Sequence, residues 1–285
     1  MKIREYKDSN YKAIFFNGKT IRQKLDITKP FKPTPTPEIL DIAINSKCYA
    51  NCSFCYTSAT KQGTNFENIV EKAKEIWGSL PENERPFQIA IGGAGESTIH
   101  PDWIDFVKTV NELGIVPNYT TNGIHLSEAI LKATEDFCGG VAISYMPHLP
   151  KFFHDGIEKL SKIKTKLNVH VIIGNEQSFI DLQSIYEKYK DVLDYFVILP
   201  YQAAGRGVSI NVEETWKKTF EWISSLSEER QSQFAFGALF YEWLKNNDTK
   251  LKMSIYEPEM FSGYVLMDDT YKMIRKSSYN LTEKI

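Results

Sequence analysis

The sequence predicts an α/β fold: a partial TIM-like (β/α)6 barrel flanked by a short N-terminal extension and an α+β C-terminal tail. Six short runs rich in β-branched and aromatic residues alternate with amphipathic stretches or turn signals. Parallel strands need crossovers of this kind, and those crossovers take one hand. The 285 residues, 42% of them apolar, also suffice to bury a sizeable core.

The six strand-like runs lie between residues 39 and 200. The clearest helical stretches between them extend from about Phe66 to Leu80 and from about Pro101 to Leu113. In chain order the runs are ILDIAIN, FQIAIGG, IVPNYTTNG, GVAISYM, LNVHVIIG and YFVILP. Because chemistry in such sheets is carried by the carboxyl ends of the strands, we expect the functional loops to follow these runs.

The N-terminal extension comprises residues 1–36. It contains a possible hairpin around Asn17-Gly18, a dipeptide suited to positive φ angles. The four prolines of KPFKPTPTPE fix an extended approach to the first barrel strand, since each removes a backbone donor. We therefore place the start of the core barrel at residue 37.

The core barrel is expected to cover residues 37–210, and the C-terminal extension residues 211–285. In the extension we expect two helical stretches, Val212 to Ser225 and Glu228 to Leu244. We expect the strands LKMSIY, GYVLMD and TYKMIR to follow them. This tail is in a position to cap the barrel mouth.

Charge and cysteine content narrow the class of protein. Lys and Arg total 34 against 36 Asp and Glu, so the net charge disfavours long nucleic acids and offers no broad attraction for acidic membranes. The polar first ten residues do not resemble a signal peptide, and no run reaches the ~20 apolar residues of a membrane span. Three of the four cysteines fall within eight residues, which is a poor disulfide framework. We expect a cytoplasmic protein that ligates metal.

A cysteine triplet directly follows the first barrel strand. Cys48, Cys52 and Cys55 have the spacing C-x3-C-x2-C in KCYANCSFCY, so their thiolates can converge from one loop. Iron–sulfur clusters are held by cysteine thiolates, and four irons with three local ligands leave one iron open to a small molecule. The alternative is a zinc site, which would need a fourth ligand such as a histidine.

This spacing, with Phe54 before the third cysteine, resembles the signature of the radical S-adenosylmethionine superfamily. The resemblance implies a [4Fe–4S] cluster on the three cysteines, with S-adenosylmethionine chelating the open iron. It also implies reductive cleavage to methionine and a 5′-deoxyadenosyl radical that removes a substrate hydrogen. The electron would come from a reductant such as flavodoxin or ferredoxin. Phe54, together with Tyr49 and Tyr56, would exclude water or simply pack in the core.

Two further loops resemble the same family. The second strand leads into GGAGESTIHP, which resembles the family's glycine-glycine-glutamate loop. Gly92 and Gly93 permit close approach of the backbone to a ligand, and Glu96 can accept hydrogen bonds from the methionine ammonium. The third strand ends in YTTNG, where Thr121 and Asn122 approach the cosubstrate or form a plain turn.

The later strands offer less specific candidates. Ser144 resembles a residue that binds ribose or carboxylate, and His170 is a candidate contact to the cosubstrate; either could be a satisfied core residue instead. Gln202 and Arg206 are expected to face substrate space, where Arg206 can bind a carboxylate or phosphate, although it could equally stabilise a loop. Cys138 is interpreted as a small buried hydrophobe.

The resemblance leaves the substrate open between a peptide, a nucleotide and another small molecule. The tail GYVLMDDTYKMIRKSS loosely resembles the strand pair after the barrel in viperin and in peptide-modifying relatives. A viperin-like nucleotide enzyme would need basic side chains for a triphosphate, and the candidates here are scattered. From another class, the chain could be a non-catalytic zinc-binding or redox-sensing module. A structural zinc site would not require the loop around Glu96.

Overall fold

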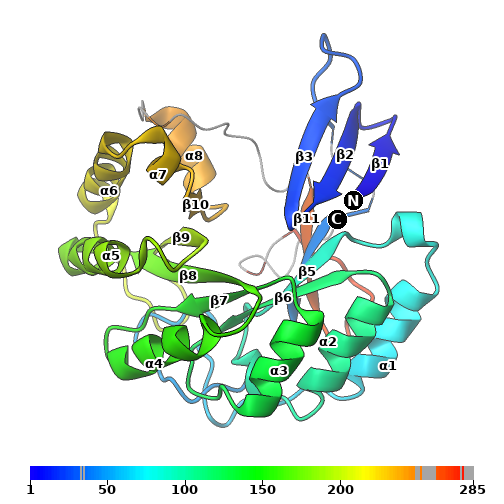
Figure 1. The fold of residues 1–285 in the computed structure, drawn as a ribbon, viewed down its shortest axis with the longest axis horizontal. Helices are drawn as coiled ribbons and strands as arrows, with labels where there is room; N and C mark the ends of the chain where they lie inside the picture. The colour runs from blue at the N-terminus through cyan, green and yellow to red at the C-terminus, as the bar shows by residue number, and fades with distance from the viewer. Residues whose placement is uncertain (33, 35, 248–250, 252–260, 277, 279–285) are drawn as a thin grey trace.

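A curled sheet of eight parallel strands forms the centre of the computed structural model, which describes all residues except 33, 35, 248–250, 252–260, 277 and 279–285 (Figure 1). Every neighbouring pair is parallel, in the order β10-β9-β8-β7-β6-β5-β4-β11. The predicted partial barrel is therefore confirmed. Its strands are β4 (Ile39–Ala43), β5 (Gln88–Ile91), β6 (Val116–Thr121), β7 (Gly140–Ser144), β8 (Lys166–Ile173), β9 (Tyr195–Pro200), β10 (Phe234–Phe236) and β11 (Ser262–Leu266).

Helices cover the convex face of this sheet (Figure 1). Alternate strand residues point toward them: in β8, Leu167, Val169, Val171 and Ile173 are buried in the apolar core. The intervening residues of each strand face the concave side. The covering helices are α1 (Ile69–Ala73), which continues into a π-helical turn at Lys74–Gly78, α2 (Trp103–Glu112), α3 (Glu128–Phe137), α4 (Pro150–Leu160) and α5 (Glu176–Tyr189).

The prediction of one continuous helix from Glu228 to Leu244 is wrong. The chain forms α6 (Glu213–Ser225) and a single turn, α7 (Glu228–Gln231), then the strand β10 beside β9, and only then α8 (Phe240–Asn246). The strand forms because the Phe234 ring packs on Tyr186 and Phe196, while the amide of Gly237 donates to the carbonyl of Ile198. Tertiary packing here overrides local helix propensity.

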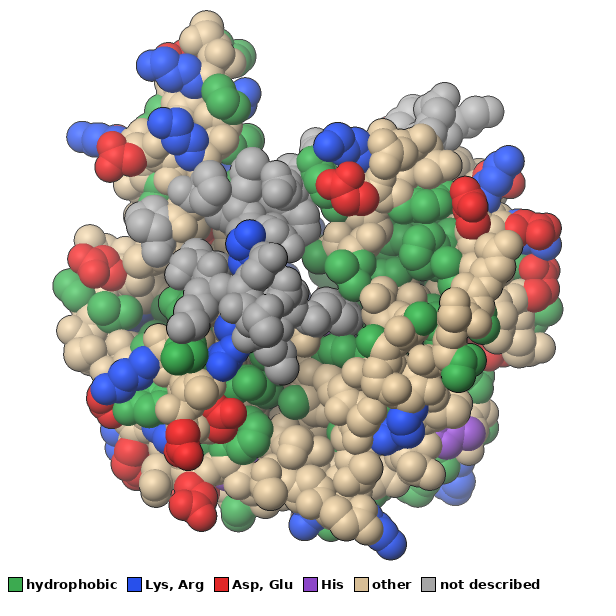
Figure 2. Space-filling model, turned by 180° about the vertical axis from the view of Figure 1, so that it is seen from behind, with side chains coloured by type: hydrophobic (Ala, Val, Ile, Leu, Met, Phe, Trp, Pro, Cys, Tyr) green, Lys and Arg blue, Asp and Glu red, His purple; other side chains and the backbone are tan. Residues whose placement is uncertain are grey.

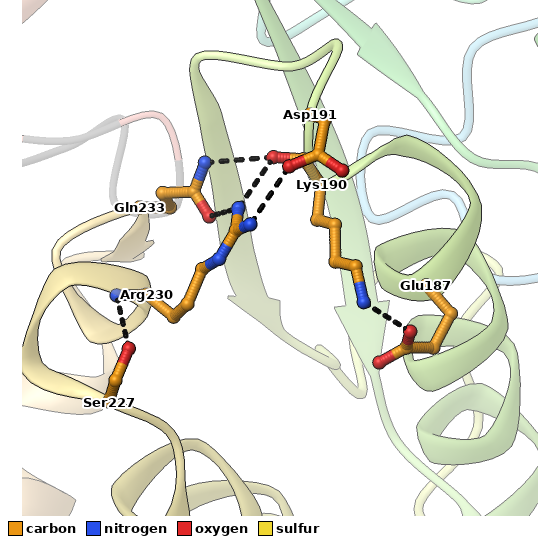
Figure 3. A network of polar contacts seen from close by, with 6 residues as sticks. All are labelled: Glu187, Lys190, Asp191, Ser227, Arg230 and Gln233. Carbon is orange, nitrogen blue, oxygen red and sulfur yellow. Dashed lines mark hydrogen bonds and ion pairs between the residues drawn. The ribbon is translucent and has the colours of Figure 1, made fainter.

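An arginine clamp fastens α7 to the turn between α5 and β9 (Figure 3). Arg230 donates to the carbonyl of Lys190 at 3.1 Å and to Asp191 Oδ1 at 2.8 Å, and Gln233 donates to the Lys190 carbonyl at 3.0 Å. The clamp holds the segment before β10 against the barrel.

The described part of the C-terminal tail extends the sheet at both edges. GYVLMD forms β11 beside β4, as expected, whereas TYKMIR is not a strand and contributes only an isolated bridge between Arg275 and Tyr264. The expected strand LKMSIY lies outside the described residues apart from Leu251. No helix in the described ranges is long and apolar enough to cross a membrane.

A separate three-stranded antiparallel sheet precedes the barrel: β1 (Lys2–Tyr6), β2 (Tyr11–Phe16) and β3 (Lys19–Lys24). The predicted hairpin joins β2 and β3, with positive φ angles at Asn17 and Gly18. This sheet meets the amino ends of the barrel strands. The rings of Phe15 and Phe87 stack with their centroids 5.4 Å apart. Lys166, at the start of β8, donates to the carbonyl of Asn17.

A buried ion pair secures this junction. Arg22 lies 2.7 Å from the carboxylate of Glu38, and the two side chains are 9% and 0% exposed. The Tyr11 hydroxyl donates to the other carboxylate oxygen at 2.7 Å. Since Glu38 immediately precedes β4, the pair fixes the N-terminal sheet to the first barrel strand.

On the face shown in Figure 2, Lys and Arg side chains are interspersed with Asp and Glu. This face shows no extended patch of one sign among the described residues, in keeping with the nearly balanced charge of the sequence.

Candidate functional site

The cysteine loop leaves the carboxyl end of β4 and folds back on itself. Lys47 pairs with Thr60 in an isolated bridge, and the amide of Cys48 donates to the carbonyl of Thr60 at 2.9 Å. Cys48, Cys52 and Cys55 are half-buried free thiols on this loop. Burial, followed by the proximity of Cys48 and Cys55, raises the pKa of Cys52 to about 11. A thiolate set in such surroundings requires a positive partner, and a metal centre can supply one.

The three cysteines fit an iron–sulfur cluster in donor type, because thiolates are the ligands that such clusters take. In the part of the chain that the structure describes, no three His, Cys, Asp or Glu side chains are grouped so as to hold a metal ion. Two histidines pack on aromatic residues of this loop: His148 contacts Phe54, and His125 contacts Tyr49.

The glycine loop after β5 is bound tightly to the cysteine loop. The amide of Glu96 donates to the carbonyl of Lys47 at 2.8 Å, and Asn45 Nδ2 donates to the carbonyl of Glu96 at 2.7 Å. A Cβ atom at Gly95 would lie 2.5 Å from the Lys47 carbonyl oxygen. Gly95, which the sequence reasoning missed, is thus required by this close approach of two backbones.

The glycine loop touches the cysteine loop a second time. The Tyr56 hydroxyl donates to the carbonyl of Gly93 at 2.8 Å, and Thr57 Oγ1 donates to the carbonyl of Ala94 at 2.8 Å. Gly92, the first glycine of the loop, donates its amide to Ile42 of β4. The loops after β4 and β5 therefore form one unit.

Glu96 joins this unit to the end of β6. The residue is 4% exposed, and its carboxylate accepts from Thr98 Oγ1 at 2.7 Å, from Thr121 Oγ1 at 2.9 Å and from the Asn122 amide at 2.7 Å. Burial raises its pKa in spite of these bonds. The structure shows Glu96 engaged by protein donors, so its contact with a methionine ammonium stays a prediction.

Asn122 reaches from the end of β6 to the cysteines. Its Nδ2 atom lies 3.6 Å from the sulfur of Cys48, within donor distance for sulfur, and its Oδ1 accepts from the amide of Ile124. Hydrogen bonds to cluster sulfurs are among the features that set the reduction potentials of iron–sulfur proteins. The expected approach of Asn122 to the cosubstrate stays a prediction, and the structure shows its side chain beside a cysteine.

Arg206 stabilises the cysteine loop, which is the second of the two roles that the sequence left open for it. Its side chain turns back to the cysteine loop, where Nε donates to the carbonyl of Cys52 at 2.8 Å and Nη1 to the carbonyl of Ala59 at 2.9 Å. Its amide donates to the carbonyl of Cys55 at 3.0 Å. The preceding Gly205 has φ +60°, and a Cβ there would lie 2.5 Å from the same carbonyl oxygen. The loop after β9 thus clasps the cysteine loop.

Replacing Arg206 by alanine should loosen the cysteine loop. Each of its two side-chain hydrogen bonds comes from a charged group and contributes about 1.5–3 kcal/mol. Their loss should accelerate hydrogen exchange of the Cys48 amide by at least about 100-fold, since about 1.4 kcal/mol is a factor of ten. Hydrogen exchange followed by mass spectrometry measures this. Arg230→Ala, which breaks the other arginine clamp (Figure 3), should leave exchange in the cysteine loop unchanged.

The remaining predicted residues occupy the concave face or the loop surface. Ser144 and His170 are register partners on β7 and β8 and are both half-buried. Burial lowers the pKa of His170 to about 4, so its imidazole is neutral near pH 7. Tyr49 is 48% exposed, which limits its expected part in excluding water from the cysteines. Cys138 packs against the core, as expected, with a pKa raised to about 12 by burial.

Two curated proteins are similar in sequence to part of this chain. No family model matches the chain. It is 29% identical over 108 residues to the tungsten-containing aldehyde ferredoxin oxidoreductase cofactor-modifying protein of Pyrococcus furiosus, covering 37% of this chain and 29% of that one. It is 27% identical over 92 residues to a 7,8-dihydro-6-hydroxymethylpterin dimethyltransferase of Methanocaldococcus jannaschii, covering 32% and 18%. The chain thus spans less than a third of these curated relatives.

Two solved structures share its fold over most of its length. Streptococcus suis SuiB bound to the precursor peptide SuiA superposes with a TM-score of 0.67 at 15% identity, over 88% of this chain and 62% of that one. The protein anSMEcpe with bound AdoMet and a Cp18Cys peptide gives 0.59 at 13% identity, over 85% and 75%. SuiB has also been solved bound to S-adenosylmethionine, with a TM-score of 0.66 at 14% identity. These superpositions confirm the fold that the sequence predicts.

Proposed function

We propose that this chain is a radical S-adenosylmethionine enzyme that holds a [4Fe–4S] cluster on Cys48, Cys52 and Cys55. It would cleave S-adenosylmethionine reductively and use the 5′-deoxyadenosyl radical to take a hydrogen atom from a substrate. The observation that carries the proposal is the joining of the cysteine loop to Glu96 and Asn122 at the carboxyl ends of three neighbouring strands. A structural metal site would not need this arrangement.

The substrate that we propose is a peptide. SuiB is bound to a precursor peptide and anSMEcpe to a Cp18Cys peptide in structures that share this fold. The names of the two curated relatives point instead to a cofactor or a pterin, so a small molecule is the second candidate. A reductant such as flavodoxin or ferredoxin would supply the electron.

The chain's own residues would hold and shield the cofactors. When bound, the cluster would supply the electron that cleaves the sulfonium. Asn122 donates toward the Cys48 sulfur, and Arg206 donates to carbonyls of the cysteine loop, so these two residues would steady the loop that carries the thiolates. The half-buried Phe54 and the backbone of Gly92 and Gly93 would limit water around the cosubstrate.

The test starts with anaerobic purification and reconstitution with iron and sulfide, in parallel with a zinc-loaded sample. After reduction with dithionite, S-adenosylmethionine is added and 5′-deoxyadenosine and methionine are quantified by mass spectrometry. We expect a brown protein that forms both products in equal amounts, and no product from the zinc-loaded sample. A colourless chain that binds zinc stoichiometrically and forms no product would overturn the proposal in favour of a zinc-binding module.

A further inference from the structure

One carboxylate lies on the concave face of the barrel. In β4, Leu40 and Ile42 are 3% and 0% exposed and pack beneath the helices, so the residue between them, Asp41, faces the opposite side. Its register partners are Ala90 on β5 and Tyr264 on β11. The Asp41 side chain is exposed, yet protein surrounds it closely enough to desolvate the carboxyl, as expected inside a curled sheet.

Within the residues that the structure describes, this carboxylate has neither a hydrogen bond nor an ion pair. On the neighbouring strands of the same face, Asn118 Nδ2 donates to Gln88 Oε1 at 3.1 Å. Lys166 belongs to the same layer of the sheet, but it stands four strands away, and its ammonium donates to the carbonyl of Asn17 at the amino end. Among the described residues, no cation of this layer therefore pairs with Asp41.

The surroundings of this carboxylate disfavour its ionised form. A desolvated charge without a partner disfavours the ionised form, and burial raises the pKa of Asp41 to about 6. Perturbed groups of this kind in a concave site are candidates for binding or catalysis.

We propose that Asp41 binds a positively charged group of the substrate, such as the ammonium of a lysine side chain or the guanidinium of an arginine. The inference rests on the proposed function and names its substrate class, a cationic peptide side chain. Ala90, the partner of Asp41, lies two residues before Gly92, so Asp41 sits about 7 Å along the strands from the glycine loop. The cation would bind on the side of the glycine loop that faces the amino ends of the strands. A triphosphate would meet this negative charge, which disfavours a nucleotide substrate.

The proposal is tested by measuring the binding of three probes, the N-acetyl methylamides of lysine, arginine and norleucine. Their termini are uncharged, so the probes differ in charge only at the side chain. Their affinities for the full chain are measured by ligand-observed NMR at pH 7.5, both as purified and after reconstitution. We expect the lysine or the arginine probe to bind at least tenfold more tightly than norleucine, and Asp41→Asn to abolish that preference. The better of the two cationic probes identifies the group. The control, Asp155→Asn, removes an exposed carboxylate that pairs with Lys151 and should change nothing.

Acidification provides a second measurement on the unmutated chain. Preference for the cationic probes should be lost between pH 7.5 and 5, because protonation of Asp41 removes its charge. The titratable group that faces it from β11 is Tyr264, whose pKa burial raises further above its ordinary value, and β5 presents only Ala90. His170 stays neutral over this range.

Equal affinities for the three probes, or an unchanged preference in Asp41→Asn, would overturn the role of Asp41. Probe binding requires neither iron nor S-adenosylmethionine. A failure of the cleavage assay therefore leaves this measurement valid, and a failure here leaves the cleavage result standing.

Discussion

Cys52→Ala should abolish reductive cleavage of S-adenosylmethionine. Changes in groups that merely support a metal ligand typically cost about 10–100-fold in metal affinity or activity, so the loss of a direct ligand should exceed about 100-fold. The middle cysteine is the most informative choice, because the carbonyl of the same residue is held by Arg206 and its backbone position should survive the substitution. The rate of 5′-deoxyadenosine formation and the iron content per chain measure the effect.

The matched control is Cys138→Ala. Cys138 is also a free thiol, but it packs between α3 and β7 against the core, away from the cysteine loop. We expect this variant to keep its iron and its cleavage rate, at a modest cost in stability. Retained cleavage in Cys52→Ala, or equal losses in the two variants, would contradict the assignment of the cluster to the triplet.

Arg22→Ala should lower the free energy of unfolding by about 3–5 kcal/mol. Removing one partner of a buried ion pair costs this much, because it leaves an uncompensated charge in the interior. The Glu38 side chain is 0% exposed, so its carboxylate would keep the Tyr11 hydroxyl but lose its cation. Urea denaturation followed by circular dichroism measures the change.

The comparison is with an exposed pair of the same kind. Lys132 and Asp136 lie 2.9 Å apart on α3 with side chains 76% and 39% exposed, so Lys132→Ala should cost less than about 1 kcal/mol. Adding Glu38→Gln to Arg22→Ala should restore part of the lost stability, since a neutral amide is cheaper to bury than a charge. A cost for Arg22→Ala as small as that of the surface pair would show that the junction is not held by this ion pair.

The strands of the barrel could be predicted from the sequence because each is a local pattern. Runs such as LNVHVIIG are rich in β-branched residues, bounded by turn signals and separated by amphipathic stretches, and these features do not depend on distant contacts. The hairpin at Asn17 and Gly18 was predictable for the same reason, since the required positive φ angles suit these two residues.

Other features depend on contacts that no local pattern records. The segment Phe234 to Phe236 becomes a strand because an edge of the barrel is available beside it. Arg206 turns to the carbonyls of Cys52 and Ala59, about 150 residues earlier in the chain, and a sequence gives no register for such a contact. The signal that was present is the pair of glycines flanking Arg206.

The position of Asp41 on the concave face could have been predicted from the sequence. In ILDIAIN it is the one charged residue of an apolar strand, and strict alternation places it opposite Leu40 and Ile42. The face that it occupies was predictable. Its lack of a partner was not, because that depends on what the neighbouring strands present at the same level.

The two outer strands of the sheet have a consequence for synthesis of the chain. Strands β4 to β9 are consecutive in sequence, but their flanks are covered by β10 at one side and β11 at the other, both from the last quarter of the chain. During translation the six central strands emerge first, with unpaired backbone groups along both flanks. Such flanks are templates for pairing with other chains. The nascent protein is therefore most exposed to misassociation until residue 266 has left the ribosome.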